Sequence, residues 1–403
     1  MFCLLGYVTA SARLTGGVLE APTWRPVRRQ IAELILDATD DETCHANLSA
    51  AIIASRAEPV GEPLAVQRID LAAALCLSPP LNAQLNRERA GADGSRFARL
   101  LETLVLSLLT FRAPETTMML HLFLDERAVR NPRIVRLLQR VVDSSGSGFA
   151  ISVQRVDSDE VTRVLLPAER GLRHGLHECA YLSALAPRLF NQSIPKLIWL
   201  DIDVVFLDSA AHLWSKFAAF DDAMLVGMAM EQTPYYITER VSWPAIGNVG
   251  VNTGVQLLKL EAMRAEAFTP AKWFHHIEKI LADGACSPGQ RGQTCLGLAD
   301  QDVWNAMLEQ EPARLFQLNC RWNTQLIALQ SRRRDMAQPC LAHIPNTQAG
   351  ALTISALHGN GGSFFAAASR ENADYGGGTH FASVQAVYDS LLDDAALWSA
   401  LLA

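Results

Sequence analysis

Hydrophobic residues along the chain alternate between short continuous runs and positions spaced three or four residues apart. Four short apolar runs are typical of strands buried on both faces of a sheet, and they cover residues 69–78, 118–125, 149–157 and 197–207. The helical spacing between these runs predicts helices over residues 99–111, 131–143 and 178–190. Because strand and helix alternate, we predict an α/β fold with a mostly parallel sheet flanked by helices.

Further elements are predicted on both sides of this alternation. Helical spacing over residues 26–56 predicts an N-terminal helical addition within residues 1–66. After the fourth run, the pattern predicts strands at 223–230, 250–260 and 354–365 and helices at 270–284, 300–310 and 384–392. We therefore expect one large domain over residues 67–395, preceded by the helical extension.

The fourth apolar run, LIWLDIDVVFL, contains Asp201 and Asp203. An unpaired buried carboxylate is very costly, so these acids must face a cation or solvent. Alternation along an extended strand predicts that both carboxylates point to one side, with Ile202 turned away. The pair is expected beyond the carboxyl end of a strand, where parallel sheets bind ligands. Two such oxygen donors suit Mn²⁺ or Mg²⁺, and the competing interpretation of the pair by itself is two solvated turn acids.

Charge and cysteine usage exclude some classes of function. The formal net charge is −7 and there is no dense Lys/Arg run, so no nucleic-acid partner is expected. The eight cysteines include no C-x-x-C pair, which gives a zinc site little support. The apolar start of the chain is shorter than the roughly 20 residues that span a bilayer. Membrane association is therefore expected only through an anchor upstream of this chain.

Five blocks in a fixed order resemble glycosyltransferase family 8, the retaining transferases with the GT-A fold. The blocks are LIWLDIDVVFLDSAAHLW, GNVGVNTGVQLLKLEAMR, ADQDVWNAM, CRWN and ALHGNGG. Within the family, the N-T-G-V, D-Q-D, C-x-W-N and H-G-N blocks are most similar to the glucoside xylosyltransferase-like branch. The resemblance covers about residues 69–392. It implies a GT-A (Rossmann-like) domain with a nucleotide-binding half over 69–207 and a sugar and acceptor half over 208–395.

The resemblance implies a metal site and a donor site. Asp201, Asp203 and His358 match the ligands of Mn²⁺, with Mg²⁺ as the alternative, and Asp201 also matches a residue that faces the nucleotide ribose. The nucleotide-sugar contacts implied by the matching blocks are Asn252, Gly254, Gly359 and Asn360. Asn offers both a donor and an acceptor to sugar hydroxyls, and Gly permits close approach. The competing interpretations are a loop histidine and an ordinary turn before a strand.

Asp300 and Gln301 match the pair beside the anomeric carbon. The acid can hold a sugar hydroxyl while the amide oxygen stabilises the positive charge of an oxocarbenium ion. Alternatively, Asp300 and Asp302 are acids that complement a helix dipole, and for Asp302 this interpretation is equally good. Trp322 and Asn323 match the acceptor side, against the interpretation of Trp322 as a core residue.

Two departures from the family pattern concern the donor diphosphate. Ser183 stands where family members usually carry an Arg, and the loop around Gly361 lacks the usual basic residue. Arg173, Arg188 or Arg291 are candidates to replace these cations. The predicted function is metal-dependent, retaining transfer from UDP-xylose, then UDP-glucose or UDP-galactose, to a hydroxyl of a glycan or glycoprotein. The alternatives are a pseudoenzyme that binds nucleotide or carbohydrate and, disfavoured for lack of a clear base, a phosphohydrolase.

The family setting implies the lumen of the secretory pathway, Golgi or ER. Two N-x-S sequons, at Asn47 and Asn191, permit this route. The candidate disulfides in loop-like stretches are Cys286–Cys295 and Cys320–Cys340. A cytoplasmic protein with eight reduced thiols is the alternative.

Overall fold

The structure is a computed structural model of the chain. It describes residues 67–77, 95–142, 148–156, 178–233, 235–236, 244–266, 279, 298–325 and 354–359. The predicted extension over residues 1–66 and the predicted helix at 384–392 lie outside the described residues. Of the predicted helix at 270–284, only Lys279 is described.

A seven-stranded sheet forms the centre of the fold, in the order β3-β2-β1-β4-β7-β6-β8. Its strands are β1 Gln67–Leu75, β2 Thr116–Leu124, β3 Phe149–Arg155, β4 Leu197–Leu200, β6 Val226–Met230, β7 Val251–Leu258 and β8 Leu315–Leu318. Strands β3, β2, β1 and β4 are parallel, β7 is antiparallel to both of its neighbours, and β8 is parallel to β6. This confirms the predicted α/β fold with a mostly parallel sheet.

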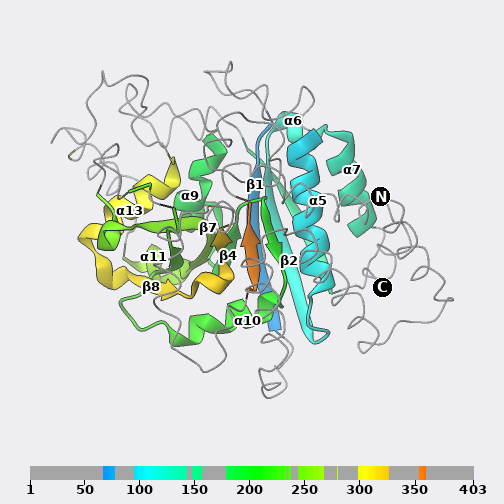
Figure 1. Ribbon diagram of the computed structural model, residues 1–403. Helices are drawn as coiled ribbons and strands as arrows, with labels where there is room; N and C mark the ends of the chain where they lie inside the picture. Colours follow the sequence, from blue (N-terminus) through cyan, green and yellow to red (C-terminus); the bar gives the residue numbers. More distant parts are fainter. Residues whose placement is uncertain are drawn as a thin grey trace, which may run out of the picture.

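Helices cover both faces of this sheet. The longer ones are α5 Ser95–Thr110, α7 Pro132–Val142, α9 Leu182–Leu189, α11 Leu260–Ala265 and α13 Asp300–Gln310. Figure 1 shows α5 and α7 on one side of β1 and β2, and α9, α11 and α13 on the other. Neighbouring residues of β1 point to opposite faces, so Leu71 packs in one hydrophobic cluster with Leu104 of α5, while Ala72 packs in the second with Trp304 of α13.

Shorter elements complete the described fold. The α-helical ones are α6 Glu126–Val129 and α10 Ala210–Trp214, and the 3₁₀ turns are η2 Glu178–Tyr181, η3 Ser215–Ala219, η4 Ile246–Asn248, η5 Pro312–Arg314 and η6 Cys320–Trp322. A second sheet of three short strands has the order β5-β10-β9, with β5 Val204–Phe206, β9 Thr324–Gln325 and β10 Ala356–His358. Of the strand predicted over 354–365, residues from 360 onward lie outside the described chain.

The single strand predicted over residues 197–207 is wrong. The chain forms β4 in the large sheet, turns at Asp201–Asp203, and enters the small sheet as β5. The Asp201 N–H donates to the Gly254 carbonyl (2.9 Å), the last contact with β7, and the Val204 N–H closes the turn on the Asp201 carbonyl (3.3 Å). The two acids therefore lie in a turn between sheets and not in a buried strand, which removes the energetic conflict that the sequence raised.

Asp208 ties the small sheet together. Its carboxylate accepts hydrogen bonds from Ser355, just before β10, at 3.2 Å, from Arg321 of η6 at 3.3 Å and from His212 of α10 at 2.9 Å. Burial raises the pKa of Asp208, but the hydrogen bond and charge of His212, with the Ser209 N–H and the charge of Arg321, together lower the pKa below its ordinary value. Three segments that are distant in sequence are thus joined at one carboxylate.

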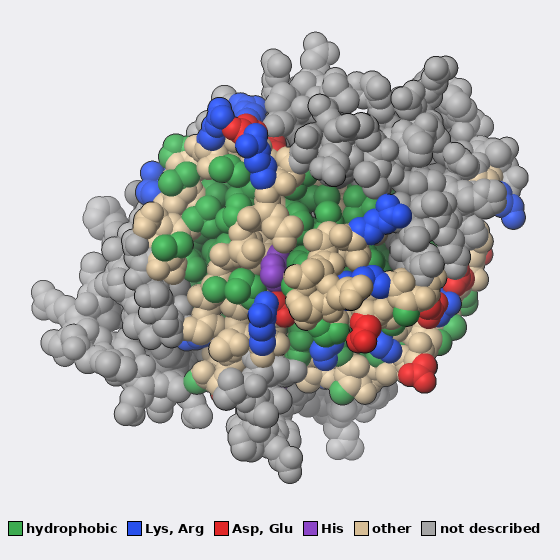
Figure 2. Space-filling model, turned by 180° about the vertical axis from the view of Figure 1, so that it is seen from behind, with side chains coloured by type: hydrophobic (Ala, Val, Ile, Leu, Met, Phe, Trp, Pro, Cys, Tyr) green, Lys and Arg blue, Asp and Glu red, His purple; other side chains and the backbone are tan. Residues whose placement is uncertain are grey.

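On the face opposite to that of Figure 1, Lys and Arg side chains lie in several separate places, some of them beside Asp or Glu (Figure 2). Ion pairs of the described residues include Arg314 with Glu311 (3.1 Å) and with Glu266 (2.6 Å). Exposed pairs of this kind contribute little to stability. Among the described residues, no helix is both long and apolar enough to cross a bilayer.

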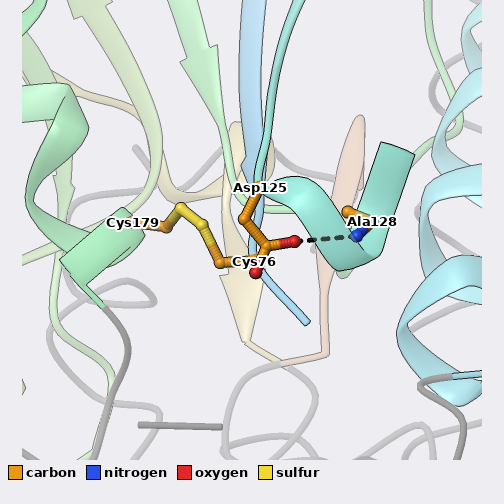
Figure 3. Close-up of a disulfide and its surroundings, with 4 residues drawn as sticks. All are labelled: Cys76, Asp125, Ala128 and Cys179. Carbon is orange, nitrogen blue, oxygen red and sulfur yellow. Dashed lines mark hydrogen bonds between the residues drawn. A yellow bond between two sulfur atoms is a disulfide. The ribbon is translucent and has the colours of Figure 1, made fainter. Parts of the chain in front are cut away.

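A disulfide joins Cys76, directly after β1, to Cys179 of η2 (Figure 3). It lies beside Asp125, whose side chain accepts a hydrogen bond from the Ala128 N–H (2.7 Å) and so caps α6. Cys320 is also disulfide-bonded, whereas Cys286, Cys295 and Cys340 of the predicted pairs lie outside the described residues. The Cys76–Cys179 bond fixes the segment that leads into α9.

The N-terminus of α13 is anchored through Asp302. Its Oδ1 accepts a hydrogen bond from the Tyr236 hydroxyl (2.7 Å), and its Oδ2 accepts one from the Leu298 N–H (2.7 Å). Asp302 is buried, with 2% of the residue's surface exposed to solvent. Burial raises its pKa to about 6, although both hydrogen bonds favour the ionised form. Asp302 is therefore a structural residue that positions the start of α13.

Replacing Cys76 and Cys179 together by Ser should lower the free energy of unfolding by about 2–5 kcal/mol, because the cross-link constrains a long segment of the unfolded chain. Urea unfolding measures this change. Each single Cys→Ser variant should lose nearly as much as the double variant, since either one removes the same bond. A non-reduced peptide map that finds both cysteines as free thiols would contradict the pairing.

The raised pKa of Asp302 makes its contribution to stability depend on pH. The folded pKa of about 6 lies above the ordinary value of 3.8. The contribution of Asp302 to stability is therefore fully present below pH 3.8 and is lost as the pH rises to about 6. Between pH 4.5 and pH 7.5 the wild-type unfolding free energy should therefore fall by about 2 kcal/mol more than that of Asp302→Asn. Urea unfolding of both proteins at the two pH values checks this, and equal falls would refute the assignment.

Candidate functional site

Asp201, Asp203 and His358 converge between the two sheets. The turn after β4 supplies the acids and the end of β10 supplies the imidazole. His358 Nε2 lies 3.5 Å from Asp201 Oδ2 and 3.4 Å from Asp203 Oδ1, and one ligand atom of each residue lies within 4.8 Å of the other two. The structure thus brings together the three metal ligands that the sequence predicted, and their oxygen and nitrogen donors suit Mn²⁺ or Mg²⁺.

The surroundings of His358 favour positive charge. Burial by itself lowers the pKa of this imidazole, but the charge of Asp203 and the hydrogen bonds to both carboxylates raise it to about 10. The carboxylates therefore attract a proton at the position where a divalent cation would be equally well placed. A metal ligand must release its proton to bind, so the affinity of this site for a cation depends on pH.

Two glycines position the imidazole and the turn. A Cβ atom on Gly254 of β7 would lie 2.3 Å from Cε1 of His358, so the imidazole fills the space that any other residue would occupy. The Gly359 N–H donates to the Asp203 carbonyl (2.7 Å) and joins the end of β10 to the turn. Both predicted glycines thus shape the metal site directly. Asn360, the other residue predicted in this loop, lies outside the described chain.

Asn252 and Gln301 meet beside the acidic turn. Asn252 of β7 donates through Nδ2 to Oε1 of Gln301 (3.1 Å), and the Thr253 N–H points to the same oxygen (3.4 Å). Asn252 Oδ1 accepts hydrogen bonds from the Gly254 N–H (3.0 Å) and from Nδ2 of Asn323 (2.8 Å). The N-T-G, D-Q-D and C-x-W-N segments, far apart in sequence, therefore form one hydrogen-bonded cluster.

Asn323 and Trp322, predicted on the acceptor side, are both buried. Asn323 is fully buried and is held by Asn252, whereas Trp322 is 2% exposed and packs in the first hydrophobic cluster. Arg321 lies above the Trp322 ring, 5.6 Å from its centroid. This packing agrees with the competing interpretation of Trp322 as a core residue.

Neutral donors hold the carboxylate of Asp300 at the start of α13. Its Oδ2 accepts hydrogen bonds from the Ser183 hydroxyl (2.7 Å) and from Nε2 of Gln256 (3.5 Å). Burial and the charge of nearby Asp201 raise the pKa of Asp300 well above its ordinary value, despite the hydrogen bond from Ser183. Ser183, the residue at the position of the family's usual Arg, is thus a direct partner of Asp300.

Of the three candidate replacements for that Arg, Arg188 is the one that lies in the described chain. Arg188 is exposed in the last turn of α9, whereas Ser183 is buried in its first turn. At 1.5 Å per residue the two positions are about 7.5 Å apart along the helix. Arg173 and Arg291 lie outside the described residues.

Sequence analysis missed the residues that complete this cluster: Glu231, Gln232, Tyr236, Gln256 and Asn305. Glu231, only 2% exposed, accepts hydrogen bonds from the side chains of both Asn252 and Gln301, at 3.0 Å each. It directly follows the apolar run at 223–230. An acid at the end of a buried run is the same signal that identified Asp201, and it would have identified Glu231.

The family model described as glycosyl transferase family 8 matches residues 113–344. A human relative, xylosyl- and glucuronyltransferase LARGE2, is 27% identical over 62% of this chain and 32% of its own length. The zebrafish xylosyl- and glucuronyltransferase LARGE2s is 34% identical over 33% of this chain and 17% of its own length. This chain therefore matches about a third or less of the length of these relatives.

Two solved structures are similar to this chain. Mouse xyloside xylosyltransferase 1 in its apo form has a TM-score of 0.48 and 20% identity, covering 73% of this chain and 99% of its own. The galactosyltransferase LgtC in complex with donor and acceptor sugar analogues has a TM-score of 0.49 and 16% identity, covering 79% of this chain and 96% of its own. The family model covers more than half of the residues and includes the acidic turn and the N-T-G, D-Q-D and C-x-W-N segments, and so this chain belongs to glycosyl transferase family 8.

Proposed function

We propose that this protein is a metal-dependent, retaining glycosyltransferase that uses a UDP-sugar donor. The observation that carries the proposal is the convergence of Asp201, Asp203 and His358 beside Asn252 and Gln301. The first three form a cation site, and the last two offer amide groups to a sugar. This combination suits a substrate in which a diphosphate is bonded to a sugar. Such a substrate requires cation ligands for the diphosphate directly beside amide groups for the sugar hydroxyls.

Mn²⁺ or Mg²⁺ bound by Asp201, Asp203 and His358 would neutralise charge on the departing diphosphate. The chain's own residues do the rest. Gly254 leaves room for His358, and Asp201, at the exposed side of the turn, faces the nucleotide ribose. Asn252 orients the donor sugar and Gly359 contacts the nucleotide, whereas Asn360, predicted to bind it as well, lies outside the described residues.

Gln301 has the electrostatic role in this proposal. Its amide oxygen carries partial negative charge without holding a proton, so it can stabilise the positive charge that develops at the anomeric carbon. Asp300 fixes the orientation of the donor sugar through a hydroxyl. Because these groups occupy one face of the sugar, the acceptor hydroxyl bonds to the anomeric carbon on the face from which the diphosphate departs. The bond to the diphosphate breaks, the proton of the hydroxyl passes to the departing diphosphate oxygen, and the α-configuration is kept.

UDP-xylose is the first candidate donor, followed by UDP-glucose and UDP-galactose. The names of the relatives support a pentose or uronic-acid donor, since they describe xylosyl- and glucuronyltransferases. The acceptor class is a hydroxyl of a glycan or glycoprotein. The disulfide between Cys76 and Cys179 supports the lumen of the secretory pathway as the compartment.

A pseudoenzyme that binds a nucleotide sugar without transfer is the second candidate. One observation favours it: Asp300 is held by the Ser183 hydroxyl where the family usually has a cation. A charge-assisted contact to the diphosphate is thereby lost, and such contacts are the stronger ones.

Incubation with Mn²⁺ and a panel of UDP-sugars separates the two candidates. The panel contains UDP-xylose, UDP-glucose, UDP-galactose and UDP-glucuronate, each offered with glycan and glycopeptide acceptors. Release of UDP coupled to acceptor glycosylation supports the transferase. Donor binding by calorimetry without transfer to any acceptor supports the pseudoenzyme, and absence of both binding and transfer refutes both.

Asp203→Ala should abolish Mn²⁺-dependent binding of UDP while the fold remains intact, because one of three cation ligands is lost. Gly254→Ala should do the same without touching a ligand, because its Cβ displaces His358. Calorimetry with UDP and Mn²⁺ measures both. Asp222→Ala is the matched control: Asp222 is an exposed acid just before β6, at the end of the strands opposite to the acidic turn, and its loss should change nothing. Unchanged affinity in Asp203→Ala would end the metal assignment.

Gln301→Ala should lower kcat by about 10²–10³-fold and leave donor affinity within a few-fold, because its amide acts mainly in the transition state. Asp300→Asn should be similar or worse. Steady-state kinetics with the best donor of the panel measures kcat, and calorimetry measures donor binding. Near-normal turnover in Gln301→Ala would remove this residue from the mechanism.

A further inference from the structure

Glu231 is the first residue after β6 and is almost completely buried, at 2% exposure. The register of β6 against β7 shifts between Met228 and Ala229, and the Glu231 N–H then pairs with the Gly250 carbonyl (2.9 Å). This irregularity sets the end of β6 beside the N-T-G segment of β7. The carboxylate thereby enters the cluster around Gln301.

Four N–H donors hold this carboxylate. Oε1 accepts from the main-chain N–H groups of Gln232 (3.0 Å) and Thr233 (2.8 Å). Oε2 accepts from Nδ2 of Asn252 and from Nε2 of Gln301, both at 3.0 Å. The two main-chain donors fix the position of the carboxylate, and its second oxygen is aimed at the two amide side chains. A buried carboxylate needs such partners, and it finds them in neutral groups.

A carboxylate can only accept hydrogen bonds, and this fact decides the orientation of Gln301. The NH₂ group of Gln301 must turn to Glu231, so its carbonyl oxygen turns to Asn252 and Thr253. The opposite orientation would set an oxygen against the carboxylate and an NH₂ group against two N–H donors. Asn252 is held independently, because its Oδ1 accepts from Gly254 and Asn323. Among the described residues, the second partner of the Gln301 NH₂ group is the Tyr236 hydroxyl, in a long contact of 3.5 Å.

We propose that Glu231 is a positioning residue that locks the Gln301 amide with its oxygen turned away from Glu231, toward Asn252 and Thr253 of the proposed donor site. This inference rests on the proposed function, since the amide oxygen is the group assigned to the anomeric carbon. Glu231 does not touch the sugar and takes no proton. Glu231 orients the Gln301 amide before the donor binds. The amide then needs no reorientation when the transition state forms.

The substitution that tests this proposal is Glu231→Gln, which keeps the shape and removes the acceptor-only character. The new NH₂ group faces the NH₂ groups of Asn252 and Gln301, so each orientation of the Gln301 amide now sets two N–H groups against each other and the preference for one orientation is lost. Turnover should fall by about 10- to 100-fold, less than the loss expected for removing the amide itself. The KM for the donor should stay within about threefold, because Asn252 keeps its other partners.

Glu231→Asp separates charge from shape. Asp keeps a carboxylate, which only accepts hydrogen bonds, but its side chain is shorter than that of Glu. Gln keeps the shape of Glu but replaces one acceptor oxygen by an NH₂ group. Turnover should follow the order Glu, Asp, Gln at this position. The order Glu, Gln, Asp would show that Glu231 acts through packing alone and would overturn the proposal.

A double-mutant cycle with Gln301→Ala tests the route of the effect. If Glu231 acts through Gln301, then Glu231→Gln should change kcat by less than about twofold in the Gln301→Ala background. Equal effects in both backgrounds would overturn the proposal. The matched control is Glu102→Gln on α5, which removes another buried carboxylate, one paired with Arg133 (2.9 Å) on the other face of the sheet. It should lower stability without a selective loss of kcat.

An NMR measurement tests the orientation of Gln301 separately from the proposed function. In protein labelled with ¹⁵N at Gln side chains, the NH₂ signals of Gln301 are identified by their absence in Gln301→Ala. Glu231→Gln should shift them and speed their hydrogen exchange, whereas Glu102→Gln should leave them unchanged. If the wild-type protein transfers no sugar but this result holds, the proposed function fails and the locking of Gln301 stands. If the signals do not respond, the locking fails whatever the turnover.

Discussion

Buried polar side chains at the end of a sheet must satisfy one another, and this requirement organises the region around β7. Asn305 of α13 bonds to both main-chain groups of Val251, through Oδ1 to its N–H (2.7 Å) and through Nδ2 to its carbonyl (2.9 Å). Gly250 belongs to the same constraint: its φ of 82° and the Tyr236 ring, 2.5 Å from where a Cβ would lie, leave no room for a side chain. α13 is thus attached to β7 by polar contacts as well as by packing.

The proposed cation site depends on this arrangement through Gly254. β7 lies beside β4 in the large sheet, so its backbone reaches the turn that holds Asp201 and Asp203. His358 comes from the small sheet and packs against Gly254 where the two sheets meet. The Asp208 cluster holds the small sheet on its other side. Contacts between the two sheets therefore set the positions of Asp201, Asp203 and His358.

The electrostatics of Asp300 connect the two proposed functions. A carboxylate beside an Arg is held ionised, whereas Asp300 is held by the Ser183 hydroxyl in a buried place and its pKa is raised. Glu231 is likewise held by neutral donors. Both buried carboxylates are therefore held by amide, hydroxyl and main-chain N–H groups and not by cations. Under the proposed function, the amides would contact sugar hydroxyls, and the attraction for the diphosphate would be left to the proposed cation site.

The sequence by itself determined the α/β alternation, because buried strands and amphipathic helices differ in hydrophobic period. The ordered blocks that resemble the family also singled out Asp201, Asp203, His358 and Gln301 as candidate site residues, and the first three converge in the structure. The sequence did not determine that the run at 197–207 divides into two strands, since hydrophobic period cannot show where a chain passes from one sheet to another. Only the tertiary structure decided the pairing of Cys76 with Cys179 and the placement of Glu231 against Gln301. Both are contacts between segments distant in sequence, and they exist only once the sheet has brought those segments together.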